Sequence, residues 1–501
     1  MDVCQVGLSR RQLLRYAALV GATFPVASAI DRGWLLSAQA GAGLALPHNL
    51  ELVTVTDTEA VVTWFTGDPT QPDEFGRPLP VAAPGRVLIG TSPDPSTWRE
   101  VGAHGKTAYH YVEIDGLEPG TTYYWRAESA GRPAVPTATP RTDPTSAAPA
   151  AFTTMVPPPG REIGRVAWLN DLHYGEQVAG LAYSNSSLPR GGLPPGFPVD
   201  PKHPYWRFMG HAAVQEAGRR GCTLLLANGD LSNEAEPAAL LECKQALDRF
   251  GRLGGTTHVH PDGPRHYFVT RGNHDRWHSG ATYAECTTKD GLSDCFGDEF
   301  TGGFEPGTQH FSITFGDHDA RYRFVGLDSN DGSKTGVLRQ SELDYLAAEL
   351  DRGEWTIPLF HHPASATASL SGVPPVTDGL DVQDAQKFRD LLGGYDNVAG
   401  VYAGHTHRNN FSTNTETGSV PYFEGGAVKE YPGGYTVVRI FEGGYLVNFW
   451  KTSAPECRAW SERSRGEYLG LGPDYQLGSL TDRNWSYAVA ARRRSRPKAR
   501  L

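Results

Sequence analysis

The sequence is poor in cysteine and has no overall excess of positive charge. Six cysteines occur among 501 residues, and none of them has the spacing of a zinc finger. The formal net charge of −10 at pH 7 argues against a protein that binds nucleic acid polymers through a basic surface. Long apolar runs are also missing beyond the N-terminal stretch, so we expect no permanent membrane span.

Residues 1–40 have the pattern of a targeting segment. Arg10 and Arg11 precede a short, mildly apolar stretch, residues 16–30, and small residues that offer cleavage sites follow. Paired arginines in this setting resemble a bacterial twin-arginine signal, which the twin-arginine export machinery reads. We therefore expect an exported protein that is secreted, periplasmic or associated with the cell wall. An uncleaved anchor, or basic residues placed by chance, is the alternative.

Export would permit disulfide bonds, because oxidising compartments preserve them. Cys4 lies in the expected leader, so an odd number of cysteines remains in the mature chain. Cys286 and Cys295 are the best local candidates for a disulfide. Cys222 opens an apolar strand and is more typical of a small core residue.

Residues 46–154 have the composition of an all-β domain. Strands are expected within Thr54–Thr66, Arg86–Gly90 and Tyr109–Ile114. Turns rich in Gly, Pro and Asp separate these strands. The stretch Leu117–Trp125 is typical of a tyrosine corner, in which a buried tyrosine binds the backbone of the turn before it. This region resembles a fibronectin type III-like sandwich. We expect it to act as a spacer or packing module; substrate shaping or cell-wall binding is the alternative.

Apolar strands alternate with amphipathic helices from residue 161 onward. Strands are expected at Val166–Leu169, Thr223–Ala227, Tyr267–Thr270, Phe311–Phe315, Phe324–Leu327, Ile357–Phe360 and Val398–Ala403, and helices near Tyr205–Arg219, Pro237–Phe250, Gln340–Leu350 and Asp381–Leu392. This pattern predicts an α/β domain whose sheet is buried on both faces. Consecutive strands between Tyr422 and Trp450 predict a second, antiparallel sheet. The domain is expected to span residues 161–451, followed by a C-terminal extension, residues 452–501, with a solvated basic tail.

Polar residues gather directly after five of the expected strands. These clusters are Asp171-Leu172-His173, Gly229-Asp230, Gly272-Asn273-His274-Asp275, His361-His362-Pro363 and Gly404-His405-Thr406-His407. Ligands bind at the carboxyl ends of strands in open α/β sheets, so the clusters should meet. Asp171 and His173 are two positions apart, which in extended backbone places both side chains on one side, and the same holds for His405 and His407.

The clusters together offer carboxylates, an amide oxygen and imidazoles. This donor set suits first-row divalent metals better than calcium or a thiolate site. Each cluster alone could instead cap a helix or hold a hydrogen-bonded loop histidine. Because all five occur together, each at a strand end, the sequence predicts a metal site.

The five blocks resemble those of the calcineurin-like metallophosphoesterase superfamily, D-x-H, G-D, G-N-H-[DE], an H-x-P-like block and G-H-x-H, over about residues 161–451. The resemblance implies a two-sheet α/β (α+β) sandwich flanked by helices, with two metal ions between the sheet ends. It assigns the ligands in three groups: Asp171, His173 and His407 to the first ion, Asn273, His361 and His405 to the second, and Asp230 to both. His274 is implied as general acid or as donor to the phosphoryl oxygens, with Asp275 orienting it. The ions would be divalent or trivalent iron, manganese, zinc or cobalt.

The resemblance also implies hydrolysis of small-molecule phosphoesters by a metal-activated hydroxide. The N-terminal fibronectin-like region adds a likeness to purple acid phosphatases. Those enzymes have a tyrosine where Asn233 stands and lack the equivalent of His173, so we expect no tyrosinate-bound ferric site. We favour a phosphodiesterase acting outside the cytoplasm on cyclic nucleotides or glycerophosphodiester-like substrates. The alternatives are a phosphomonoesterase of the acid phosphatase type and an exported binding module with weak hydrolase activity.

Overall fold

The computed structural model describes residues 45–73, 77–137, 148–180, 197–276, 286, 295–330, 335–364, 379–414, 417, 419–467 and 473–489. The expected leader and the basic run at 492–500 lie outside these residues. None of the described helices combines the length and the apolar character that crossing a bilayer requires.

The N-terminal part is a β-sandwich of two antiparallel sheets. One sheet contains β1 (Leu46–Val55), β2 (Ala60–Pro72), β3 (Pro78–Pro80) and β6 (Tyr109–Ile114). The other contains β4 (Ala83–Gly90), β5 (Arg99–Thr107), β7 (Thr122–Ser129), β8 (Arg132–Pro133) and β9 (Ala151–Thr153). The expected strand Thr54–Thr66 divides into β1 and β2, because the Thr56 N–H donates to the carbonyl of Glu59 and closes a turn between them. The predicted tyrosine corner is confirmed: the buried Tyr123 hydroxyl accepts a hydrogen bond from the Glu118 N–H at 2.9 Å.

Two mixed sheets follow, each with seven strands among the described residues. The first sheet has the order β14 (Arg252–Leu253), β16 (His266–Thr270), β13 (Leu224–Asn228), β10 (Glu162–Leu169), β23 (Gly434–Phe441), β24 (Gly444–Lys451) and β25 (Asn484–Ala488). The second sheet has the order β15 (His258–Val259), β17 (Phe311–Gly316), β18 (Arg321–Gly326), β19 (Trp355–Leu359), β20 (Val401–Ala403), β22 (Val420–Glu424) and β21 (Asn410–Asn414).

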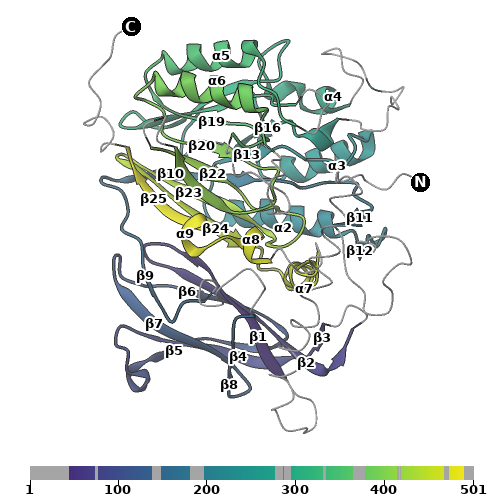
Figure 1. Ribbon diagram of the computed structural model, residues 1–501, viewed down its shortest axis with the longest axis vertical. Helices are drawn as coiled ribbons and strands as arrows, with labels where there is room; N and C mark the ends of the chain where they lie inside the picture. The colour runs from purple at the N-terminus through teal and green to yellow at the C-terminus, as the bar shows by residue number, and fades with distance from the viewer. Residues whose placement is uncertain are drawn as a thin grey trace.

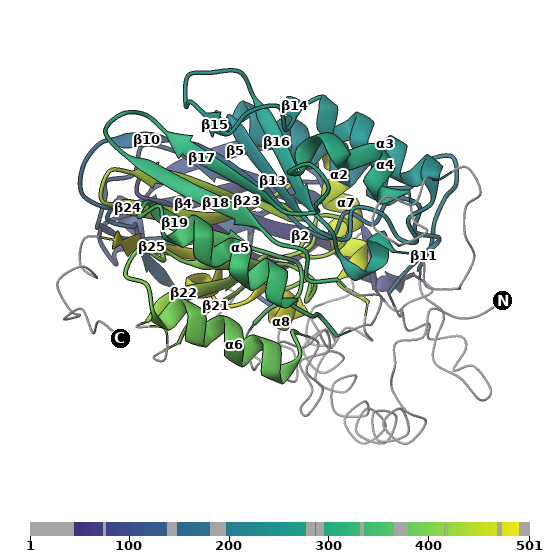
Figure 2. The same cartoon turned by 90° about the horizontal axis from the view of Figure 1, so that it is seen from above.

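Helices pack around the two sheets and at their junction with the β-sandwich (Figure 1). They are α2 (Tyr205–Arg219), α3 (Pro237–Asp248), α4 (Phe296–Phe300), α5 (Gln340–Leu350), α6 (Val382–Gly393), α7 (Pro455–Ser464), α8 (Pro473–Leu477) and α9 (Leu480–Arg483). Helices α5 and α6 lie next to each other on the second sheet, at the end of the molecule opposite the β-sandwich (Figures 1 and 2). Helices α2, α3 and α7 pack with the first sheet in a separate apolar cluster.

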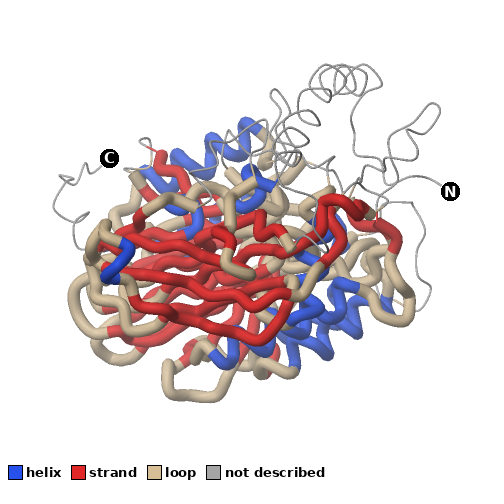
Figure 3. Tube along the Cα trace, turned by 90° about the horizontal axis from the view of Figure 1, so that it is seen from below, coloured by secondary structure: helices blue, strands red, loops and turns tan. Residues whose placement is uncertain are grey.

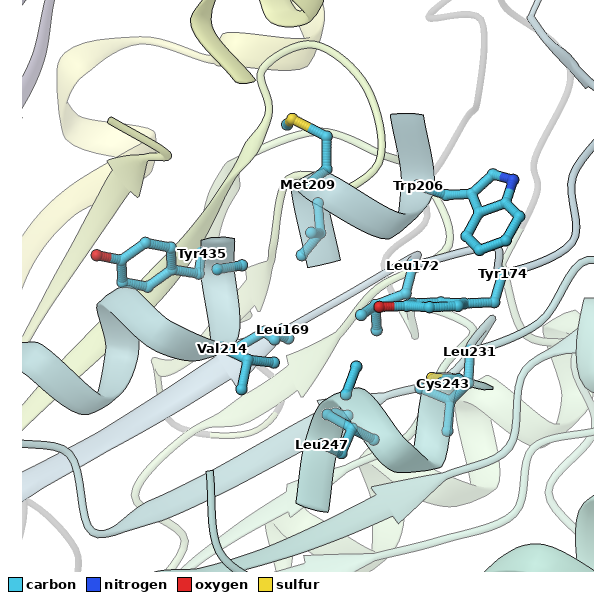
Figure 4. Packing of buried hydrophobic residues seen from close by; sticks show 14 of the residues in the cluster. Leu169, Leu172, Tyr174, Trp206, Met209, Val214, Leu231, Cys243, Leu247 and Tyr435 are labelled. Atoms are coloured by element: carbon cyan, nitrogen blue, oxygen red, sulfur yellow. The ribbon is translucent and has the colours of Figure 1, made fainter. Parts of the chain in front are cut away.

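The alternation of side chains along β10 explains why both faces of the first sheet are apolar. Val166 and Trp168 point into the core between the two sheets, where the Trp168 ring stacks on Tyr402 with centroids 4.0 Å apart. Ala167 and Leu169 point the other way, and Figure 4 shows Leu169 beside residues of α2 and α3. The predicted fold class, a two-sheet sandwich flanked by helices and preceded by an all-β sandwich, is confirmed.

The prediction of a separate antiparallel sheet between Tyr422 and Trp450 is wrong. Strand β22 pairs with β20 and β21 in the second sheet, whereas β23 and β24 join the first sheet beside β10. Apolar runs and glycine turns identify strands but do not select their partners. The first sheet also continues beyond the expected end at residue 451, because β25 pairs with β24.

The β-sandwich is joined to the first sheet by buried polar contacts. The Arg483 guanidinium is buried and donates to the carbonyls of Val53 and Leu52 at 2.8 and 2.6 Å. The amide of Asn448 on β24 donates to the carbonyl of Val55 at 2.8 Å. Seen from below, the sandwich strands lie across this side of the molecule (Figure 3). The two parts of the chain therefore share an interface that contains buried hydrogen bonds.

Candidate metal centre

The five polar clusters follow strands whose carboxyl ends meet. Strands β10, β13 and β16 are parallel neighbours in the first sheet, and β19 and β20 are parallel neighbours in the second. Because the two sheets pack face to face, the residues after these strands converge at one edge of the sandwich. The first sheet supplies mainly oxygen ligands there, and the second supplies imidazoles.

The structure brings the predicted residues into two groups of potential ligands. The groups are Asp171, His173, Asp230 and His407, and Asp230, His361 and His405, with the ligand atoms of each group within 4.8 Å of one another. Asp230 belongs to both: its Oδ2 lies 3.4 Å from Nε2 of His173 and 3.1 Å from Nε2 of His361. The shared carboxylate therefore lies between the two groups, as a bridging ligand would.

Several buried atoms of the predicted ligands have no hydrogen-bond partner in the protein. Oδ2 of Asp171, Oδ1 of Asn273 and Nε2 of His405 are buried and make no hydrogen bond. Leaving such an atom unsatisfied costs about 1–3 kcal/mol, so a cluster of them calls for a ligand. Carboxylate, amide and imidazole atoms in this arrangement fit first-row metal ions.

The backbone at five of the predicted ligands is left-handed. The φ angles are 55° at Asp171, 48° at His173, 49° at Asp230, 71° at His405 and 54° at His407. The expectation of extended backbone in D-x-H and H-x-H is therefore wrong. Non-glycine residues in this region cost about 1–3 kcal/mol each, and such strain gathers at functional sites.

Two glycines allow the clusters to approach one another. Gly229 has φ of 83°, and a Cβ there would lie 2.3 Å from Nδ1 of His361. A Cβ on Gly272 would lie 2.2 Å from Oδ1 of Asp230. Any larger residue at either position would displace a predicted ligand.

Two of the predicted ligand histidines are oriented through their second ring nitrogen. Nδ1 of His361 lies 3.0 Å from the backbone carbonyl of Asn228, and Nδ1 of His407 lies 2.6 Å from Oε1 of Glu430. Such contacts fix the tautomer and aim Nε2 at the centre of the site. Sequence patterns did not identify Asn228 or Glu430, since neither belongs to a motif block.

His274 lies half-buried beside Asp230, whose Oδ1 accepts a hydrogen bond from the His274 N–H at 2.8 Å. Its Nδ1 lies 2.9 Å from the carbonyl oxygen of Asn233. The Asp275 carboxylate instead accepts from the backbone N–H groups of Leu231, Ser232 and Gly272. This corrects the expected role of Asp275: the Asn233 carbonyl orients the imidazole, and Asp275 holds the loop that carries Asp230.

Burial and charge act against each other within the site. Burial raises the pKa of Asp171 to about 6, although His407 opposes the shift. Burial would also raise the pKa of Asp230, but the charges of His361 and His274 outweigh it and hold that pKa well below its usual value. Burial disfavours the charged form of His361, yet the Asp230 carboxylate raises its pKa to about 9. Asp230 is thus held in its ionised form between the two ligand groups.

Comparison with known proteins agrees with this geometry. Residues 164–409 match the family model of the calcineurin-like phosphoesterases, and residues 47–144 match that of the purple acid phosphatase N-terminal domain. The chain belongs to the calcineurin-like metallophosphoesterases. It is therefore a phosphoester hydrolase, of a family with a dinuclear metal centre, and its buried Asp/His cluster has the donors for one.

Solved structures resemble this metallophosphoesterase at low sequence identity. A dimetal phosphatase from Danio rerio is 13% identical with a TM-score of 0.39, covering 58% of this chain and 98% of its own. Purple acid phosphatase PPD1 from yellow lupin (Lupinus luteus) seeds is 15% identical with a TM-score of 0.37, and the match covers 83% of this chain and 73% of the lupin chain. PhoD is 12% identical with a TM-score of 0.33, and the match covers 82% of this chain and 87% of PhoD. No curated protein matches the chain.

We predict that Asp230→Ala loses both metal ions, because the change removes the carboxylate that both ligand groups share. Removing a residue that hydrogen-bonds a metal ligand lowers metal affinity by ~10–100-fold, and removing Asp230 itself should lower it by more. Equilibrium dialysis followed by elemental mass spectrometry measures this. His203→Ala, at an exposed histidine outside the groups of potential ligands, should bind metal like the wild type. Two retained ions in Asp230→Ala would contradict the assignment.

Proposed function

We propose that this metallophosphoesterase hydrolyses small-molecule phosphodiesters, such as cyclic nucleotides or glycerophosphodiester-like compounds, outside the cytoplasm. The observation that carries the proposal is the pairing of His173 with Asn233 beside Asp230. Oδ1 of Asn233 lies 3.5 Å from Nδ1 of His173, at the position where a purple enzyme has its tyrosine. A neutral amide here leaves no phenolate to stabilise a ferric ion, so the site favours divalent ions.

The proposed ligands of the first ion are Asp171, His173, Asp230 and His407, and those of the second are Asp230, Asn273, His361 and His405. Two ions held there would activate water and neutralise charge on the phosphoryl oxygens. The identity of the ions is open to iron, manganese, zinc or cobalt, because the same donors serve each.

His274 is the proposed proton donor. The Asn233 carbonyl can only accept a hydrogen bond, so Nδ1 of His274 carries a proton. A second proton, on Nε2, can pass to the oxygen of the departing alcohol. The Asp275 carboxylate accepts hydrogen bonds from backbone N–H groups of the loop that carries Asp230, and so keeps this loop in place during the proton transfer.

The match to a purple acid phosphatase N-terminal domain favours a second candidate, a phosphomonoesterase. Turnover of bis(p-nitrophenyl) phosphate and of p-nitrophenyl phosphate across pH separates the two, with metal content measured on the same sample. We expect the higher kcat/KM for the diester. Monoester preference at acid pH would replace the diesterase with the phosphatase. If fully metal-loaded protein hydrolyses neither compound, the alternative of an exported binding module would replace both candidate functions.

We predict that His274→Ala lowers kcat by ~10²–10⁴-fold, because the leaving oxygen loses its proton donor. The metal content should stay at the wild-type level, since the backbone N–H that binds Asp230 remains. His260→Ala, at an exposed histidine, serves as the control and should keep wild-type turnover. Wild-type kcat in His274→Ala would remove the residue from the mechanism.

Export by the twin-arginine route is proposed on the Arg10-Arg11 pair. The predicted disulfide between Cys286 and Cys295 is present, which suits an oxidising compartment. In a bacterial host that has the route, the double variant Arg10→Lys, Arg11→Lys should accumulate inside the cell. Fractionation with an immunoblot measures this. Wild-type protein found in the cytoplasm would remove the basis for an extracellular substrate.

A further inference from the structure

A cluster of ionisable side chains is buried behind His407. Glu430, Lys429, Glu176 and Glu467 are each less than a tenth exposed. Lys429 and Glu430 belong to the loop between β22 and β23, and Glu176 follows the D-x-H block. Burying charge costs free energy unless the groups are paired, so their arrangement needs an explanation.

Glu430, Lys429 and Glu176 form a chain that ends on His407. Oε1 of Glu430 lies 2.6 Å from Nδ1 of His407, and Oε2 lies 3.4 Å from Nζ of Lys429. The same Nζ of Lys429 also pairs with Oε1 of Glu176, at 2.5 Å. Lys429 thus places a positive charge beside the carboxylate that contacts His407.

The backbone of the same loop is fixed to the metal centre. The N–H of Lys429 donates to the carbonyl of Asp171 at 3.3 Å, and the N–H of Val428 donates to the carbonyl of Asn170 at 2.9 Å. The position of Glu430 is therefore set by the same segment that presents Asp171. A shift of one would move the other.

The four ligand histidines differ in what holds Nδ1. Nδ1 of His173 lies 3.5 Å from the amide oxygen of Asn233, and Nδ1 of His361 lies 3.0 Å from the backbone carbonyl of Asn228. Nδ1 of His405 lies 3.2 Å from Nε2 of His361. Among these contacts between described residues, His407 has the carboxylate and the shortest distance. A carboxylate partner makes an imidazole a more basic and better oriented ligand.

We propose that Glu430 is a positioning residue that holds His407 for its metal ion, with Lys429 and Glu176 keeping the carboxylate in place. The inference rests on the ligand assignment proposed above. Glu430 acts on one ligand group only, because His407 belongs to the group of Asp171 and His173. Its removal should therefore weaken one ion and spare the other.

The test is a titration of metal-free protein with Mn²⁺, followed by equilibrium dialysis and elemental analysis. Glu430→Gln keeps the size of the side chain and removes its charge. Affinity for one of the two ions should fall by ~10–100-fold, with the other unchanged. Glu216→Gln is the matched control, since Glu216 is also buried and accepts hydrogen bonds from Ser453 away from the site.

The outcomes separate the inference from the proposed function. Wild-type protein that binds no Mn²⁺ overturns the ligand assignment itself. Unchanged affinities in folded Glu430→Gln, or equal losses for both ions, overturn the positioning role alone. Thermal unfolding of the metal-free variants reports whether they fold. If Glu430→Gln does not fold, Glu430→Asp keeps the charge but draws it back from His407, and its affinity for the same ion should fall, by less than 100-fold.

Discussion

One buried carboxylate, that of Asp230, joins the two halves of the site. Its oxygens face His173, which comes from the first sheet, and His361, which follows a strand of the second. A carboxylate without exposure to water is costly unless positive charge surrounds it. The relative position of the two sheets therefore decides whether this group is compensated. The apolar core between the sheets, with Trp168 stacked on Tyr402, fixes that position.

The rigidity of that core also supports the strained backbone around the site. Five left-handed residues at about 1–3 kcal/mol each would not persist in a loosely packed loop. They follow strands that are buried on both faces, so the favourable free energy of packing offsets the local cost. The side chains of D-x-H and H-x-H reach the centre because the backbone turns sharply after each strand.

Sequence reasoning was strongest where periodicity and strand ends carry the signal. Helix α2 has the expected bounds, and the residues after β10, β13, β16, β19 and β20 meet as expected. It failed where pairing depends on distant parts of the chain. The strands between Tyr422 and Trp450 belong to two different sheets, and the apolar runs that identify these strands do not indicate which sheet each one joins. Glu430 and the Asn233 carbonyl were missed because one stands in no motif and the other acts through its backbone.

The contact between Arg483 and the first strand of the β-sandwich has a consequence for the order of folding. The two partners are 430 positions apart in the chain. During synthesis β1 leaves the ribosome long before Arg483 does, so the carbonyls of Leu52 and Val53 have no contact with the Arg483 guanidinium until 430 further residues have been added. Contacts of such sequence separation form late and slow the overall reaction. The joint between the sandwich and the sheets is therefore closed by the C-terminal part of the chain, and a nascent chain cut before α9 would leave β1 without its buried donor.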